Sequence, residues 1–172
     1  MDEENQSKGP DLANARHSAK ALLKSAKITS TPITIKQIMP FVRETFDVTV
    51  EGLDDAAFKG KGDAMTQTRG DYVFIIYNKS KPEVRKRFSV AHEIGHLYRG
   101  HLHGNSSIDL NSENYDEMEA NTFAAHLLMP PDLLRKDIKA GIKNPEELAN
   151  KYNVSLDALW VQLRSTNLFK IL

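Results

Sequence analysis

The sequence contains no cysteine among its 172 residues. A disulfide framework is therefore excluded, and so is any metal site that depends on thiolate ligands. A metal ion bound by this chain must be held by histidine and carboxylate side chains. The sequence also lacks a run of about 18 apolar residues, so no segment is expected to cross a membrane.

The chain has no excess of either charge. Lysine and arginine together number 23, as do aspartate and glutamate, so the formal net charge is +0. This balance gives no overall electrostatic attraction to nucleic acid or to a membrane surface. Residues 1–10 lack a basic segment followed by an apolar run, which is the pattern of a secretory signal. The cytoplasm is therefore the expected location.

The order of predicted elements indicates an α+β fold. Hydrophobic periodicity and turn residues predict helices at 11–27 and about 33–46, strands at 47–53 and 72–78, longer helices at 83–99 and 113–128, and two or three short helices from 131 onward. We expect a small antiparallel sheet packed on the helices. The expected organisation is a disordered tail at 1–10, a main domain at 11–130 and a helical segment at 131–172 packed on it.

One predicted helix contains an H-E-x-x-H motif, from His92 to His96. Because His92 and His96 are four residues apart, both imidazoles project from one face and can share a tetrahedral zinc ion. Glu93 lies about 100° around the helix, where it can act on a metal-bound water instead. The same pattern can arise by chance on a solvated helix. A third ligand elsewhere in the sequence would favour a zinc site over a solvated helix face.

A third histidine on the same segment would indicate a metzincin, which needs glycine at position 99 and histidine at position 102. The chain has Arg99 and Leu102 there, and Gly100 and His101 are each out of register. This argues against that class. His101 could still contact the site from the end of the helix.

A carboxylate from the next long helix is the other option, and Asp116, Glu117 and Glu119 are available. The apolar stripe of that helix comprises Ala120, Phe123, Ala124 and Leu127. Glu117 lies at the edge of this stripe, so its carboxylate is expected to point inward and to need a partner such as zinc. Asn121, one turn later, can orient a ligating histidine, whereas Glu119 falls on a more polar face. The alternative for Glu117 is a capping or ion-paired carboxylate.

Two segments, "RKRFSVAHEIGH" at 85–96 and "EMEANTFAAHLLMP" at 117–130, resemble the ImmA/IrrE family of metallopeptidases. The resemblance implies a zincin-like domain in which His92, His96 and Glu117 bind one Zn²⁺ and Glu93 is the catalytic residue. Mn²⁺ and Fe²⁺ also suit two histidines and a carboxylate.

The same resemblance implies a function. Family members act as cytoplasmic zinc endopeptidases that cleave helix-turn-helix transcriptional repressors and relieve repression under stress. A helix-turn-helix repressor or an antitoxin is therefore the expected protein substrate, with stress-response or mobile-element genes as the regulated target. The oligomeric state is left open.

Several details of the chemistry stay open at this level. The oxyanion of the transition state needs a donor besides the metal. The candidates for that donor are Tyr98, His101, His103, Tyr115 and His126. The strand at 72–77 either pairs with an extended substrate or is a plain core strand.

The competing hypothesis is a regulator that does not cleave. Residues 144–165 are typical of a helix-turn-helix, with Ser155 as the cap of the second helix. A DNA-binding regulator, or a metal-sensing pseudo-protease, would use this segment. However, Arg164 is the only basic residue in the second helix, and Trp160 and Leu163 are suited to packing. We therefore expect this segment to pack or to dock a repressor rather than to contact DNA.

Overall fold

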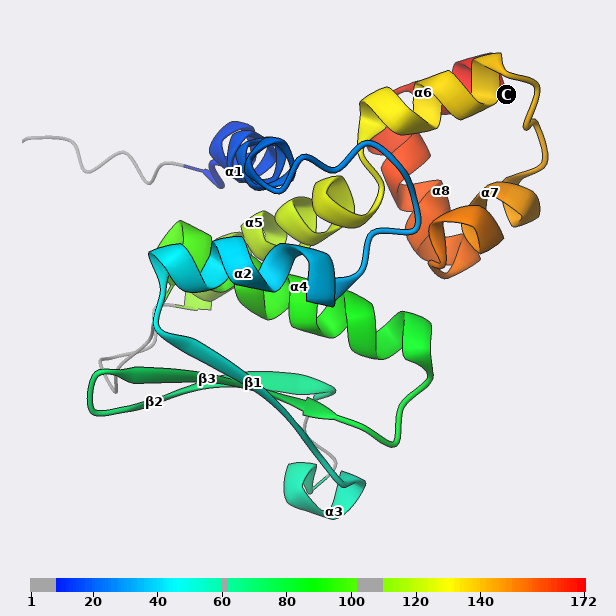
Figure 1. Cartoon of the computed structure of the whole chain (residues 1–172). Coiled ribbons are helices and arrows are strands. Elements are labelled where there is room, and N and C mark those ends of the chain that lie inside the picture. Colours follow the sequence, from blue (N-terminus) through cyan, green and yellow to red (C-terminus); the bar gives the residue numbers. More distant parts are fainter. Residues whose placement is uncertain (1–8, 60–61, 102–109) are drawn as a thin grey trace, which may run out of the picture.

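The computed structural model describes residues 9–59, 62–101 and 110–172, without the side chains of residues 110–114 (Figure 1). Its helices are α1 (Leu12–Ser25), α2 (Ile35–Thr45), α3 (Asp55–Phe58), α4 (Glu83–Arg99), α5 (Leu110–Leu128), α6 (Pro131–Lys139), α7 (Pro145–Tyr152), α8 (Leu156–Ser165) and the short 3-10 helix η1 (Leu168–Ile171). Its strands are β1 (Val48–Leu53), β2 (Ala64–Arg69) and β3 (Tyr72–Asn78). The predicted α+β class is confirmed. Most of the predicted tail, residues 1–8, lies outside the described residues.

The three strands form a mixed sheet in the order β1-β3-β2. β2 and β3 are an antiparallel hairpin that turns at Gly70, where the backbone φ is 62°. β1, however, runs parallel to β3. Our expectation of a wholly antiparallel sheet is therefore wrong. The reason lies in the connection: β2 runs back against the direction of β1, the hairpin reverses the chain again, and β3 then inserts beside β1.

The central strand β3 is covered on both faces, as its unbroken apolar run predicts. Ile75 and Ile76 point to opposite sides of the sheet, and both are buried. In Figure 1, α2 and α4 lie over one face of the sheet and α3 lies on the other side. This arrangement places the motif-bearing helix α4 directly against the sheet.

Helices α4 and α5 cross in close contact because α4 carries Gly95 at the crossing. A Cβ atom built on Gly95 would lie 3.0 Å from both the Cα and the carbonyl oxygen of Ala120, and 3.2 Å from the Cβ of Phe123. Carbon atoms in good contact are roughly 3.5–4.0 Å apart. The missing side chain therefore allows the helix with the H-E-x-x-H motif to approach the helix that carries Glu117.

The C-terminal helices pack on the same hydrophobic core as α1, α4 and α5. Their fully buried members are Leu134, Ile138, Leu148, Tyr152, Leu159 and Leu163. Trp160 is partly buried against the same core. The predicted cap is present, since the Ser155 hydroxyl accepts a hydrogen bond from the Ala158 N–H at 3.2 Å. None of the described helices is long and apolar enough to span a membrane.

Candidate metal centre

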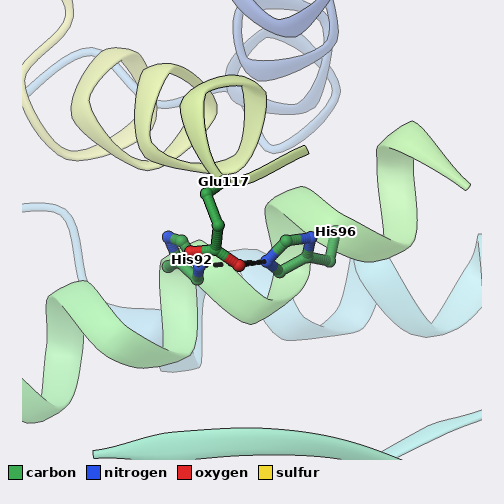
Figure 2. Close-up of side chains that lie close together, drawn as sticks. All are labelled: His92, His96 and Glu117. Carbon is green, nitrogen blue, oxygen red and sulfur yellow. Dashed lines mark hydrogen bonds and ion pairs between the residues drawn. The ribbon is translucent and has the colours of Figure 1, made fainter. Parts of the chain in front are cut away.

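His92, His96 and Glu117 converge between α4 and α5 (Figure 2). The Nε2 atoms of His92 and His96 are 3.0 Å apart. Each of them lies 3.1 Å from one carboxylate oxygen of Glu117. Ligand atoms arranged tetrahedrally at about 2.0–2.1 Å from zinc are roughly 3.3 Å from one another. These three side chains therefore fit one metal ion both in chemistry and in spacing.

The exposure of Glu117 differs from what the apolar stripe of its helix predicted. Its side chain is 56% exposed, whereas those of His92 and His96 are 15% and 12% exposed. The carboxylate reaches the two imidazoles from the rim of the helix pair rather than from the core. An open side of this kind leaves room for water or a substrate next to the three ligand atoms.

Burial keeps His96 in the form that can bind a metal. Burial, together with the neighbouring His92, lowers the pKa of His96 to about 4, although the Glu117 carboxylate opposes this effect. The neutral imidazole is therefore the stable form at neutral pH. Only the neutral form has a lone pair to offer a cation.

Asn121 holds the other histidine in a defined orientation. Its side-chain oxygen lies 2.9 Å from the Nδ1 atom of His92. Because an amide oxygen only accepts hydrogen bonds, the proton of His92 resides on Nδ1 and the Nε2 lone pair faces Glu117. The position predicted for Asn121, beside a candidate ligand, agrees with this contact.

His96 is held by a longer chain of contacts that begins with His101. The Nδ1 atoms of His96 and His101 are 3.2 Å apart. On its other side, the Nε2 atom of His101 lies 3.2 Å from carboxylate oxygens of both Asp116 and Glu119. Burial lowers the pKa of His101, although these two carboxylates act to raise it. His101 thus contacts the candidate ligand His96 on the side of the ring away from Glu117.

Glu119 is the buried carboxylate of α5, contrary to the polar face on which periodicity placed it. It accepts hydrogen bonds from the Arg99 Nε at 2.7 Å and from the Asp11 backbone N–H at 2.6 Å. Burial opposes its ionisation, but these hydrogen bonds prevail and its pKa lies below the ordinary value. Sequence reasoning missed this role, because the contact with Asp11 joins residues 108 positions apart.

Glu93 faces the sheet side of α4 and is not one of the three clustered candidate ligands. The Thr66 hydroxyl of β2 donates a hydrogen bond to one of its carboxylate oxygens at 2.6 Å. Burial raises the pKa of Glu93, and the Thr66 hydrogen bond and the nearby His92 reduce that effect. No sequence pattern pointed to Thr66, which reaches Glu93 only through the packing of β2 against α4.

Two of the remaining candidates, Tyr98 and His126, make their contacts away from the three candidate ligands. Tyr98 packs between Phe46 and Phe123, with ring centroids 5.1 and 5.3 Å away. His126 lies farther along α5, where its Nδ1 donates to the Thr122 carbonyl oxygen at 3.0 Å. Tyr115 is partly buried near the start of the described side chains of α5. His103 lies outside the described residues.

Comparisons with known proteins identify the family and the fold of this chain. The family model described as the IrrE N-terminal-like domain, a peptidase family, matches residues 43–164. A comparison with curated proteins finds no match. A solved Mycobacterium tuberculosis transcriptional regulator is similar in fold, with a TM-score of 0.69 and 12% identity over 88% of this chain and 46% of that chain. The chain thus spans about half the length of that regulator. Because the family model covers most of the sequence, the chain belongs to the IrrE N-terminal-like domain family.

Proposed function

We propose that this chain is a zinc-dependent endopeptidase that hydrolyses a peptide bond in a protein substrate. The observation that carries the proposal is the convergence of His92, His96 and Glu117 within 4.8 Å of one another, with Glu93 on the same helix as the two histidines. Two imidazoles and one carboxylate, with a position left open, are a common ligand set of catalytic zinc. Membership of a peptidase family supports the same activity.

The roles of the protein groups follow from their positions. Zinc, when held by the three ligands, supplies Lewis-acid activation of water and of the scissile carbonyl. Glu93 accepts a proton from the attacking water and delivers it to the leaving amine. Its raised pKa favours uptake of that proton, and the Thr66 hydroxyl directs its carboxylate. Asn121 and His101 orient the two histidines.

Of the two edge strands of the described sheet, β1 and β2, the second lies next to the candidate site. The strand at 72–77 cannot pair with an extended substrate, because β3 is paired on both sides and its backbone groups are occupied. β2 has one edge without a partner among the described strands, and it carries Thr66 next to Glu93. We infer that the substrate backbone lies along β2 and presents its scissile bond to Glu93.

For the substrate we propose a helix-turn-helix repressor or an antitoxin in the cytoplasm, whose cleavage would derepress stress-response or mobile-element genes. The support for this substrate is the resemblance of the two motif segments to the ImmA/IrrE family. We also propose that 11–130 form the catalytic domain and that the packed helices of 131–172 support it.

Direct DNA reading by α7 and α8 is not favoured by the geometry. Leu163 of α8 is buried and Trp160 packs on the core. The guanidinium of Arg164 lies 5.7 Å from the centroid of the Trp160 ring. Little of α8 is therefore suited to a DNA groove, and we propose a packing role for it.

The decisive experiment compares the wild type with Glu93→Gln and with Glu83→Gln, an exposed glutamate at the start of the same helix. Each zinc-loaded protein is incubated with candidate helix-turn-helix regulators, and the products are identified by mass spectrometry. We expect cleavage by the wild type and by Glu83→Gln. Glu93→Gln should retain zinc and lose cleavage. Cleavage by Glu93→Gln would refute the mechanism, and a regulatory response without any cleavage would favour a metal-dependent regulator.

A further inference from the structure

Two hollows lie side by side on the face of the molecule formed by α1, α5, α6 and α8. The first, of about 460 Å³, lies between α1 and the start of α6, and we call it the α1–α6 hollow. The second, of about 370 Å³, lies between α5 and α8, and we call it the α5–α8 hollow. Arg16 and His126 line both of them. Figure 1 shows these helices gathered around the C-terminal end of α5, away from the sheet.

A row of basic side chains borders the α1–α6 hollow. Arg16, Lys20 and Lys24 all line it, and their spacing of four residues places them on one face of α1. Among the described residues that line this hollow, the one carboxylate is that of Asp132, 3.4 Å from Lys20, and both of those side chains are largely exposed. An exposed pair of this kind is weak. The row is a local feature, since the chain as a whole has a formal net charge of +0.

The lining of both hollows is mostly apolar. Its apolar members are Leu23, Ile28, Pro130, Pro131 and Leu133 in the first, and Leu12, Phe88, Ala125, Ala158 and Val161 in the second. Val161 is 64% exposed, so it offers a hydrophobic side chain at the surface of α8. Basic side chains beside an apolar lining complement a segment with one acidic and one apolar face.

The α5–α8 hollow adjoins the metal centre through one residue, Asn121. Asn121 lines it, and the side-chain oxygen of Asn121 contacts His92. Phe88 lines it as well, one turn before His92 on α4. A chain bound in this hollow would therefore contact Asn121, the hydrogen-bond partner of the candidate ligand His92.

We propose that this double hollow is a docking surface for an acidic amphipathic helix of the protein substrate, which it holds next to the metal centre. The substrate assignment depends on the proposed peptidase function, whereas the docking itself does not. Nucleic acid fits less well, because the apolar lining is mostly aliphatic and Phe88 is its one phenyl ring, beside the imidazoles of His17 and His126.

Binding can be tested without any cleavage. The probe is a fluorescein-labelled synthetic peptide of about 20 residues, with leucines at helical spacing on one face and glutamates on the others. A matched peptide has lysine in place of glutamate. Anisotropy is measured with the zinc-loaded Glu93→Gln protein, so that the peptide is not cleaved during the measurement. The test variant combines Arg16→Glu, Lys20→Glu and Lys24→Glu, and its control combines Lys36→Glu, Lys139→Glu and Lys170→Glu, three exposed sites elsewhere.

We expect the acidic peptide to bind the parent protein and the control, and the test variant to bind it about tenfold more weakly or worse. Raising the ionic strength from about 0.01 M to about 0.15 M should also weaken binding. Val161→Glu should also weaken binding of the acidic peptide. Because Val161 is exposed, this variant serves as the test if the triple variant fails to fold. Equal binding by the test variant and the control, equal binding of the lysine peptide, or displacement by a DNA duplex would overturn the proposal.

Binding and cleavage measurements together distinguish a failure of the docking proposal from a failure of the proposed peptidase function. If the acidic peptide binds as described but the wild type cleaves no protein, the docking surface stands and the peptidase function fails. If the wild type cleaves a regulator and the triple variant cleaves it equally well, the peptidase function stands and the docking proposal fails.

Discussion

The Nδ1 atom of His101 lies 3.2 Å from the Nδ1 atom of His96, on the side of the ring away from Glu117. Two nitrogens at this distance share one proton, so one of them donates and the other accepts. If His96 binds a metal through Nε2, its proton is on Nδ1 and His101 accepts it. His101 then carries its own proton on Nε2, which faces the carboxylates of Asp116 and Glu119. The chain of contacts is thus consistent with metal binding at every step.

Removal of this support should weaken metal binding. We expect His101→Ala to lower zinc affinity by about 10–100-fold, the usual effect of losing a hydrogen-bond partner of a ligand. His101→Asn keeps an acceptor near the position of Nδ1 and should lose less. Competition with a chromophoric chelator measures both affinities. Equal affinities for the wild type and His101→Ala would show that His101 has no part in positioning His96.

Thr66 gives a second test of the proposed chemistry, this time on the catalytic carboxylate. Thr66→Val removes the hydroxyl that donates to Glu93 at 2.6 Å and keeps the shape of the side chain. We expect activity to fall by about 10–100-fold while the zinc content is unchanged. Thr66→Ser retains the hydroxyl and should retain most of the activity. If Thr66→Val is as active as the wild type, the contact with Glu93 has no role in the reaction.

The close crossing of α4 and α5 predicts a specific stability effect. Gly95→Ala gains helix propensity worth roughly 1 kcal/mol. However, its new Cβ would lie 3.0 Å from backbone atoms of Ala120, and the overpacking should cost about 1–3 kcal/mol. Urea unfolding of the zinc-loaded proteins should therefore show a net loss or, at best, no gain. Lys36→Ala, at an exposed position of α2, is the control and should change stability by less than about 0.5 kcal/mol. A clear stabilisation by Gly95→Ala would show that the helices can separate at little cost.

His126 predicts how stability responds to pH. Burial lowers its pKa below 6.5, and the nearby Arg16 adds to the effect, although the hydrogen bond to the Thr122 carbonyl opposes it. The unfolded chain therefore binds a proton at His126 that the folded chain does not, in the window from 6.5 down to the folded pKa. Within that window the free energy of unfolding decreases as the pH falls.

Denaturant titrations between about pH 7.5 and about pH 5 should show that the free energy of unfolding of the wild type decreases as the pH falls. The decrease should be smaller in His126→Gln. Arg16→Gln removes one of the causes and should also reduce the slope. Parallel curves for the wild type and His126→Gln would contradict the prediction, because the other histidines are common to both proteins.

The parts of the site that lie within one helix could be predicted from the sequence. The spacing of His92 and His96 requires only helical geometry, and α4 forms as expected from Glu83 to Arg99. Glu117 and Asn121 were also found as candidates, because residues four apart share a helix face. The burial of Glu117 was predicted wrongly, since the apolar stripe describes the average direction of a side chain and not where its long carboxylate arm ends.

The contacts between distant segments could not be predicted. The parallel pairing of β1 with β3 depends on the insertion of β3 between β1 and β2, which no local pattern specifies. The contact of Thr66 with Glu93 spans 27 positions, and that of Asp11 with Glu119 spans 108. Both depend on how whole elements pack, and hydrophobic periodicity states only which face of an element is buried.

The central claim is that His92, His96 and Glu117 hold one metal ion. The most direct test is the metal content of the purified protein, determined by elemental analysis for the wild type, Glu117→Ala and the exposed control Glu146→Ala. We predict about one zinc ion per chain in the wild type and the control, and loss of most of it in Glu117→Ala. A wild type that retains no metal after incubation with zinc at neutral pH, or a Glu117→Ala variant that retains as much as the control, would contradict the account.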